Sequence, residues 1–291
     1  MVSKIWFTAF LLLKAVIHFS EAQEAPEVEG PEIEGPENGT SAFFNLPGCG
    51  VRPFRGLVIG GVNATANSWP WIISLRIGGR HSCGGSLIRP NWVLTAAHCL
   101  FHPIISEYRV VVGAHSLSGS TPVQEVFTVK RIITHPDFSL NTLQNDIALV
   151  ELNGNVTLSM KVNLACLPPQ GSRIPPGRLC VITGWGRTTP SGPSADILQQ
   201  ATLPVGSQSD CSIRNGAIVP IDERSMLCAG GQGTSGGCNG DSGGPLNCLE
   251  GNSWVVRGVV SWGEIGCPTD FYTVFARVSS YIEWINQNIS G

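Results

Sequence analysis

Charged side chains are scarce in this chain. Asp, Glu, Lys and Arg together make up 13% of its 291 residues, and the formal net charge is −3. From Val58 to the C-terminus, 14 acidic residues balance 14 basic ones, without a basic cluster or a block of like charge. Because nucleic-acid binding requires concentrated Lys and Arg, the composition does not favour a nucleic-acid ligand.

Two further absences narrow the class of protein. No apolar run reaches the roughly 18 residues of a membrane-spanning helix, so no membrane partner is expected. The ten cysteines include no CxxC pair and no cysteine–histidine cluster with the spacing of a zinc site. We therefore expect no metal and no other cofactor. An even number of cysteines is interpreted as a set of disulfides, formed in an oxidising compartment.

The first 48 residues differ in composition from the rest. Lys4, the apolar run "IWFTAFLLL" and the small residues of "SEA" predict a secretory signal peptide over residues 1–22, and hence a secreted, extracellular protein. Residues 23–48 are rich in Pro, Glu and Gly and are interpreted as a solvated linker within a propeptide. The sequons for N-glycosylation agree with secretion; they begin at Asn38, Asn63, Asn155 and Asn288.

In the rest of the chain, short runs of apolar residues recur between Gly, Pro, Asn and Ser. "WIISLRI", "YRVVVGA" and "VVRGVVSW" are rich in β-branched and aromatic residues, which predicts an all-β sandwich or barrel of antiparallel strands. One helix is predicted near the C-terminus, over about residues 279–289, where Ser280 and Glu283 match a capping box. Its isoleucines share one face at helical spacing: Ile282, Ile285 and Ile289.

Three short stretches carry reactive side chains. "LTAAHC" holds His98, "NDIALV" holds Asp146 and "CNGDSGGPL" holds Ser242. A serine hydroxyl needs a base to take its proton as it attacks, a neutral imidazole can do so near pH 7, and a buried carboxylate orients that imidazole. Each residue alone is more often a core or loop residue. The indication comes from the three together, in the chain order of a known triad lineage.

These motifs, with "CGGSLI", "ITGWG" and "RVSSYIEWIN", resemble the chymotrypsin family of serine peptidases, and its pancreatic chymotrypsin and elastase branch most, from Cys49 to the C-terminus. The resemblance implies a peptidase domain over residues 58–291. Its fold would be two antiparallel six-stranded Greek-key β-barrels, about 58–165 and 166–277, with a C-terminal α-helix. The implied disulfides are Cys49–Cys166, Cys83–Cys99, Cys180–Cys248, Cys211–Cys228 and Cys238–Cys267.

The same resemblance implies a role for each reactive residue. His98 is the general base, Asp146 orients it and Ser242 is the nucleophile, so that hydrolysis passes through an acyl-enzyme. The backbone N–H groups of Gly240 and Ser242 would form the oxyanion hole. Glycine suits position 240, because a Cβ would hinder the backbone conformation that turns its N–H toward the substrate.

Activation is implied by the stretch "RGLVIGG" at residues 55–61. Active members of the family begin with two apolar residues and two glycines, and this new N-terminus pairs with the acid before the nucleophile, here Asp241. Residues 49–57 are then the activation segment, and the bond to be cut is Leu57–Val58. The alternative is a cut after Arg55 followed by removal of two residues, because a longer N-terminus would leave the buried carboxylate unpaired.

The resemblance also assigns the pocket for the substrate side chain. Gly236 stands at its base, where trypsin-like members carry an Asp, and Gly237 follows. Without that charge, a buried Lys or Arg of the substrate would lack a partner. Gly263 leaves the mouth open and Thr273 shortens the back wall, which implies cleavage after Leu, Met or Phe. The substrate backbone would pair as an added strand with Ser261, Trp262 and Gly263.

Taken together, the motifs predict a serine endopeptidase that is made as a zymogen. It is expected to be a monomer that acts on proteins or peptides and binds protein protease inhibitors. The alternative is a binding protein on the same fold that has lost catalysis. Such homologues usually lack one of the three catalytic residues, and this chain retains all three.

Overall fold

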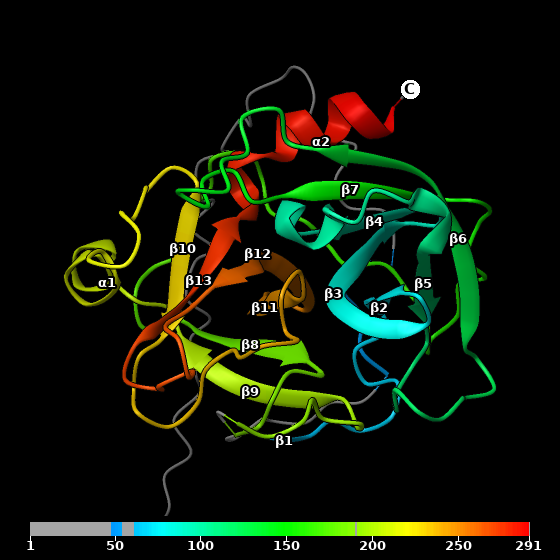
Figure 1. Cartoon of the computed structure of the whole chain (residues 1–291), viewed down its shortest axis with the longest axis horizontal. Helices are drawn as coiled ribbons and strands as arrows, with labels where there is room; N and C mark the ends of the chain where they lie inside the picture. The colour runs from blue at the N-terminus through cyan, green and yellow to red at the C-terminus, as the bar shows by residue number, and fades with distance from the viewer. Residues whose placement is uncertain (1–47, 54–60, 190, 291) are drawn as a thin grey trace, which may run out of the picture. The chain divides into compact units, whose positions relative to one another are not determined.

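The chain folds mainly into antiparallel β-strands, drawn as arrows in Figure 1. The computed structural model describes residues 48–53, 61–189 and 191–290. The predicted signal peptide, the linker up to residue 47 and the bond between Leu57 and Val58 lie outside the described residues. Within the described ranges, no helix has both the length and the apolar character needed to cross a membrane.

Six strands close into a barrel in the order β2-β3-β4-β7-β6-β5. Their bounds are β2 Ile72–Ile77, β3 Arg80–Arg89, β4 Trp92–Thr95, β5 Tyr108–Val112, β6 Glu125–Thr134 and β7 Ala148–Leu152. The β2–β3 hairpin turns at Gly78 and Gly79, whose φ angles of 56° and 81° suit a two-residue turn that other residues adopt poorly. Strands β4 and β7 are buried along their whole length, as expected for neighbours inside a packed domain.

A second sheet has the order β1-β9-β8-β11-β12-β13-β10. Its strands are β1 Val62–Asn63, β8 Leu179–Gly184, β9 Gln199–Pro204, β10 Met226–Gly230, β11 Pro245–Glu250, β12 Ser253–Trp262 and β13 Tyr272–Arg277. Without β1 it has the six strands expected of the second barrel. An isolated bridge between Val205, which follows β9, and Ala229 of β10 brings the two end strands of these six together. The fold is therefore the predicted all-β one, with a closed barrel and a second sheet that curls into a half-barrel.

Strand β1 differs from the sequence-based expectation, which assigned residues from 58 onward to the first barrel. Val62 and Asn63 instead pair with β9 of the second sheet. Side chains hold them there, because the Gln199 Nε2 group donates to Asn63 Oδ1 at 2.8 Å. Nearby, Trp69 Nε1 donates to Gln200 Oε1 at 2.8 Å. The chain thus contacts the second sheet before it enters the first barrel.

The two halves meet through buried polar and close backbone contacts. Trp71 Nε1, next to β2, donates to Asn247 Oδ1 of β11 at 2.7 Å. A Cβ added to Gly84 of β3 would lie 2.9 Å from the Cα of Gly244, so the two backbones touch where no side chain fits. The functional residues described below lie along this junction.

The predicted C-terminal helix is α2, Ile282–Ile289, and it packs Ile282 and Ile285 into the core that the first barrel also lines. The predicted capping box is wrong. The helix follows a 3-10 turn, Val278–Ser280, its N-cap residue is Tyr281, and no side chain caps it. Ser280 Oγ donates instead to the carbonyl oxygen of Arg224, an acceptor that only the tertiary fold supplies.

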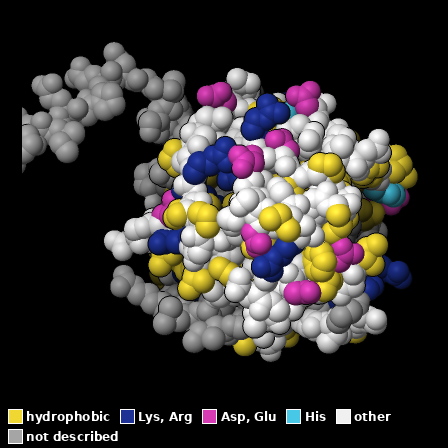
Figure 2. Space-filling model, turned by 90° about the vertical axis from the view of Figure 1, so that its left-hand side faces the viewer, with side chains coloured by type: hydrophobic (Ala, Val, Ile, Leu, Met, Phe, Trp, Pro, Cys, Tyr) yellow, Lys and Arg dark blue, Asp and Glu magenta, His cyan; other side chains and the backbone are white. Residues whose placement is uncertain are grey.

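Helix α1, Gln208–Asn215, was not predicted from the sequence. It lies at the side of the second sheet, next to β10 in Figure 1. Ser207 caps it, because its side chain accepts a hydrogen bond from the backbone N–H of Asp210. The face of the domain seen in Figure 2 carries basic and acidic side chains interspersed with apolar ones.

Candidate active site

His98 and Asp146 are brought together by two neighbouring strands. His98 lies in the 3-10 turn Ala97–Leu100 just after β4, Asp146 lies just before β7, and Thr95 pairs with Ala148 between these strands. His98 Nδ1 is 2.7 Å from Asp146 Oδ2, and the His98 backbone N–H donates to Asp146 Oδ1 at 2.9 Å. A carboxylate only accepts, so Nδ1 carries the proton. His98 Nε2 is then left with the lone pair that a general base needs.

Asp146 has a further donor. The Ser261 hydroxyl donates to Asp146 Oδ2 at 2.5 Å, and both side chains are buried. Together with the two contacts from His98, the carboxylate accepts three hydrogen bonds, which suits an ion that is 1% exposed. Ser261 reaches it from β12, where the register with β13 shifts between Val260 and Trp262.

Ser242 stands beside the turn that carries His98. Its carbonyl oxygen accepts from the backbone N–H of Gly84 at 2.8 Å, across the junction of the two halves. The next residue, Gly243, packs so closely that an added Cβ would lie 2.3 Å from Thr95 Oγ1 and 3.2 Å from Sγ of Cys99. Since Cys99 follows His98 in the chain, the backbone at Ser242 and Gly243 packs against the turn that carries His98.

Gly240 has a φ angle of +103°, a conformation in which only glycine is unstrained. Its carbonyl oxygen lies 3.0 Å from His81 Nε2, and His81 Nδ1 lies 2.9 Å from Ser74 Oγ. A carbonyl only accepts, so Nε2 donates and Nδ1 accepts from the Ser74 hydroxyl. Burial, with a smaller contribution from Arg76, lowers the pKa of His81, which keeps the ring neutral and suited to this pattern.

A base oriented by a buried carboxylate, beside a serine followed by two tightly packed glycines, is an arrangement for acyl transfer. A protein-family model described as Trypsin matches residues 58–285. The chain belongs to the trypsin family of serine peptidases.

Two relatives support this assignment at high coverage. Chymotrypsin-C of Bos taurus is 45% identical over 240 residues, which cover 80% of this chain and 88% of the relative. Chymotrypsin-like elastase family member 1 of Macaca fascicularis is 45% identical over 243 residues, which cover 80% of this chain and 90% of the relative. Membership of the trypsin family and these relatives make the chain a serine endopeptidase of the chymotrypsin and elastase type. The reading as a chymotrypsin-family peptidase is thus confirmed.

The disulfides found in the structure are the ones that the family resemblance implies. They are Cys49–Cys166, Cys83–Cys99, Cys180–Cys248, Cys211–Cys228 and Cys238–Cys267. Two of them frame the site, because Cys99 follows His98 and Cys238 lies four residues before Ser242. Cys49–Cys166 attaches the described start of the activation segment to the domain, with the Gly50 N–H donating to Leu164 O at 2.8 Å.

The structure places the residues that the resemblance assigns to the substrate pocket near one another. Thr273 Oγ1 accepts from the Gly237 N–H at 2.7 Å, and a Cβ added to Gly237 would lie 3.0 Å from Thr273 Cγ2. At Gly236 the nearest atom would be Thr273 Oγ1 at 3.5 Å, and at Gly263 it would be Tyr272 O at 4.0 Å. Thr273 therefore packs tightly against Gly237, whereas there is space beside Gly263.

The carboxylate of Asp241, the residue before Ser242, is held by backbone groups. The Gly186 N–H donates to its Oδ1 at 2.8 Å and the Cys238 N–H donates to its Oδ2 at 3.0 Å. A Cβ added to Gly184 would lie 2.1 Å from the same carboxylate, so the "GWG" glycines are sterically required. Burial raises the pKa of Asp241, and the two N–H donors oppose that rise. A cavity of about 510 Å³ adjoins the carboxylate and extends to Gly236.

The sequence did not predict the contacts of two residues near the site, Ser261 and His81. Ser261 was assigned only a backbone contact with substrate, but its hydroxyl also reaches Asp146. His81 was not singled out, although it holds the carbonyl of Gly240. The only sequence signal for His81 was its place beside the "CGGSLI" motif, which states nothing about a contact 159 residues away.

Proposed function

We propose that this serine endopeptidase is secreted as a zymogen, is activated by cleavage between Leu57 and Val58, and cleaves its substrates after Leu, Met or Phe. The observation that carries the specificity is the pocket wall of Thr273 against Gly237, with uncharged Gly236 at the base. Such a pocket accepts a medium-sized apolar side chain by burying its surface. It offers no counter-ion to a Lys or Arg side chain.

The proposed chemistry assigns one task to each group. His98 takes the proton of the Ser242 hydroxyl as its oxygen attacks the scissile carbonyl carbon, and then gives that proton to the leaving amine. Asp146 keeps the imidazole in the tautomer with its proton on Nδ1 and stabilises the ring when it is protonated. Water then attacks the acyl-enzyme with His98 again as base. The backbone N–H groups of Gly240 and Ser242 are proposed to bind the developing oxyanion.

Activation is proposed to act through Asp241. Its enclosed carboxylate has a raised pKa and adjoins a cavity large enough for a chain end. A new α-ammonium at Val58 would favour the charged form of this carboxylate. The pair would then hold the loop that contains Gly240 and Ser242. A terminus at Gly56 would be two residues longer and would not fit the same pairing distance.

Secretion rests on the predicted signal peptide and on five disulfides, which persist in oxidising compartments. The two named relatives are chymotrypsin-C and an elastase family member, and the same class of protein or peptide substrate is proposed for this chain. We further propose that it works as a monomer and is bound by protein protease inhibitors.

The test is N-terminal sequencing of whichever form reacts with a serine-directed phosphonate probe. A reactive form that begins at Val58 is expected, and the variant Ser242→Ala should not react. Arg55→Gln is the decisive companion variant. It should activate like the parent if Leu57–Val58 is cut directly, and it should fail under tryptic activation if trimming after Arg55 is the route.

Specificity is measured separately on the activated enzyme with peptide p-nitroanilides. We expect kcat/KM for Leu and Phe substrates to exceed that for Lys by about 100-fold or more. A reactive form that begins at Gly56 would overturn the proposed pairing. Preferred cleavage after Lys would overturn the assignment of the pocket and leave the activation proposal standing.

A further inference from the structure

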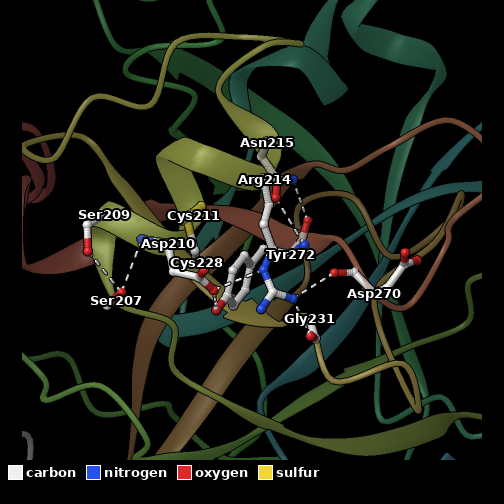
Figure 3. Close-up of polar contacts among 10 residues, drawn as sticks. All are labelled: Ser207, Ser209, Asp210, Cys211, Arg214, Asn215, Cys228, Gly231, Asp270 and Tyr272. Carbon is white, nitrogen blue, oxygen red and sulfur yellow. Dashed lines mark hydrogen bonds and ion pairs between the residues drawn. A yellow bond between two sulfur atoms is a disulfide. The ribbon is translucent and has the colours of Figure 1, made fainter.

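Helix α1 carries a polar network that the proposed catalytic chemistry does not use (Figure 3). The Tyr272 hydroxyl donates to Asp210 Oδ2 at 2.5 Å, and Arg214 Nε lies 3.0 Å from the same oxygen. Asp210 and Arg214 are one helical turn apart on α1, whereas Tyr272 begins β13. The network therefore joins the helix to the strand that also carries Thr273.

Arg214 extends the network to two loops. Its Nη1 donates to the carbonyl oxygens of Gly231 at 2.8 Å and Asp270 at 3.1 Å. Figure 3 draws these two hydrogen bonds from one end of the guanidinium. The Gly231 loop runs on to Gly236, and the Asp270 loop leads into β13. One side chain thus ties both segments that border the pocket to the same helix.

The position of Tyr272 is defined by its backbone and its ring as well. The Asn215 amide donates to Tyr272 O at 2.9 Å and accepts from Tyr272 N–H at 3.1 Å, in a fully buried setting. A Cβ added to Gly206 or Gly231 would lie 2.5 Å or 2.9 Å from Tyr272 Cε1. The ring therefore fills the space between two glycine backbones and cannot shift without moving them.

The path from the helix to the pocket is continuous. Tyr272 is followed by Thr273, whose Oγ1 accepts from Gly237 and whose methyl group packs on the same glycine. On the rim, Gly233 N–H donates to Thr269 O at 2.9 Å, which joins the two bordering loops a second time. A displacement of Tyr272 would thus move the back wall and the rim of the pocket together.

We propose that Asp210 and Arg214 are positioning residues for the substrate pocket. Through Tyr272 they hold Thr273, through the carbonyl contacts of Arg214 they hold the two loops, and so they set the affinity for large substrate side chains. The inference rests on the proposed assignment of Gly236, Gly237 and Thr273 to that pocket. Neither Asp210 nor Arg214 borders the pocket directly, so their effect is transmitted by packing and hydrogen bonds.

The ion pair itself is a poor candidate for a stabilising element. The Asp210 and Arg214 side chains are 38% and 40% exposed, and a pair in water contributes little to folding. The Tyr272 hydroxyl is the first cause of the lowered pKa of Asp210, ahead of Arg214. The Asp210 carboxylate also lies closer to the Tyr272 hydroxyl, at 2.5 Å, than to Arg214 Nε, at 3.0 Å.

The experiment compares Tyr272→Phe, Asp210→Ala and Arg214→Met with the parent on p-nitroanilides ending in Ala, Leu and Phe. Active sites are first titrated with the phosphonate probe. KM for the Phe substrate should rise about 5- to 10-fold while kcat stays within about 2-fold. The Ala substrate, which does not reach the wall, should be hydrolysed as by the parent. Tyr272→Phe keeps the ring and so keeps the fold.

Arg224→Met is the matched control, because Arg224 forms a 3.5 Å ion pair with Asp222 and its side chain is 90% exposed. It should leave every constant unchanged. The proposal also requires that Tyr272→Phe and Asp210→Ala be non-additive in KM, since each removes one end of the same hydrogen bond. Additive effects, or equal losses on the Ala and Phe substrates, would show a general structural role and overturn it.

Thr273→Gly separates this inference from the function on which it rests. If the pocket assignment holds, Thr273→Gly should raise kcat/KM for Trp relative to Leu by about 10-fold. If Thr273→Gly has this effect while the α1 variants keep the KM and kcat of the parent, only the positioning role is overturned. No change in Thr273→Gly would overturn the pocket assignment itself.

Discussion

Ser261 can contact the substrate through its backbone and Asp146 through its hydroxyl, and the direction of the hydroxyl decides the second contact. In an unbroken strand its side chain would follow the alternation of β12, but the register with β13 shifts between Val260 and Trp262. Such a shift re-aims side chains locally. Ser261 thereby becomes a donor to Asp146 at 2.5 Å, in addition to its expected backbone contact with substrate.

Ser261→Ala should lower kcat about 10-fold with KM within about 2-fold, because Asp146 loses one of its donors and orients the imidazole less firmly. Steady-state kinetics on a Leu p-nitroanilide measures both constants. The matched control is Ser86→Ala: Ser86 is also a buried strand serine, and its Oγ has no hydrogen-bond partner among the described residues. Equal kcat values for parent and Ser261→Ala would refute a role for this hydroxyl.

At the scale of elements, one exposed carboxylate joins two loops from different halves of the domain. Asp196 Oδ2 accepts from Ser116 Oγ at 2.7 Å, and Asp196 Oδ1 accepts from Ser118 N–H at 2.8 Å. The backbone adds a bond from Leu117 N–H to Asp196 O at 2.8 Å. The hydrogen bonds from Ser116 and then Ser118 lower the pKa of Asp196. The carboxylate therefore remains an acceptor down to acidic pH.

Asp196→Ala should speed cleavage of the segment 191–195 by an added protease, because the side-chain half of this connection is lost. The comparison is made in the Ser242→Ala background to prevent self-cleavage, and mass spectrometry locates the cut. Glu283→Ala, which removes an exposed acid from α2, is the control. Cleavage of this segment at the parent rate in Asp196→Ala would show that the backbone contact alone holds the loop.

The connection made by Asp196 weakens as the pH falls. A carboxyl whose folded pKa lies below its ordinary value of about 3.8 stabilises the fold above that value. The contribution is lost as the pH falls through the lowered pKa. The parent and Asp196→Ala should therefore become equally sensitive to cleavage by an added protease only in strong acid.

At the scale of the whole domain, His81 connects the first barrel to the loop of the nucleophile. It lies on β3, packs edge-on against Trp185 with ring centroids 5.5 Å apart, and bonds to Gly240. Burial lowers its pKa, so the folded state holds this proton less tightly than the unfolded chain does. Protonation in mild acid should thus favour unfolding.

The free energy of unfolding of the parent, relative to His81→Gln, should decrease as the pH falls below about 6.5, the ordinary pKa of histidine. Urea unfolding at pH 7.5 and 5.5, again in the Ser242→Ala background, measures the difference. Asp241, whose raised pKa acts in the opposite sense, is common to both proteins and cancels. A difference independent of pH would contradict a neutral, half-buried His81.

Local pattern was enough for much of the fold. β-branched residues at strand spacing predicted the strands, and the isoleucines at 282 and 285 predicted a buried face on α2. Helix α1 was missed because its mean hydropathy is low and only Cys211 and Asn215 are buried, so it has no apolar stripe to detect. The capping signal at Ser207 and Asp210 was present in the sequence and would have marked its start.

The sequence by itself indicated the chemistry of this protein: a histidine, an aspartate and a serine in motifs of the trypsin family, with glycine at the position where, by the resemblance, trypsin-like members carry a charged residue. Short motifs suffice for this, because the reaction requires those residue types. Only the tertiary structure decided which distant groups support them, namely Ser261 on Asp146, His81 on Gly240, and α1 on Tyr272. These contacts span 62 to 159 residues. They depend on strand register and packing, which no local pattern encodes.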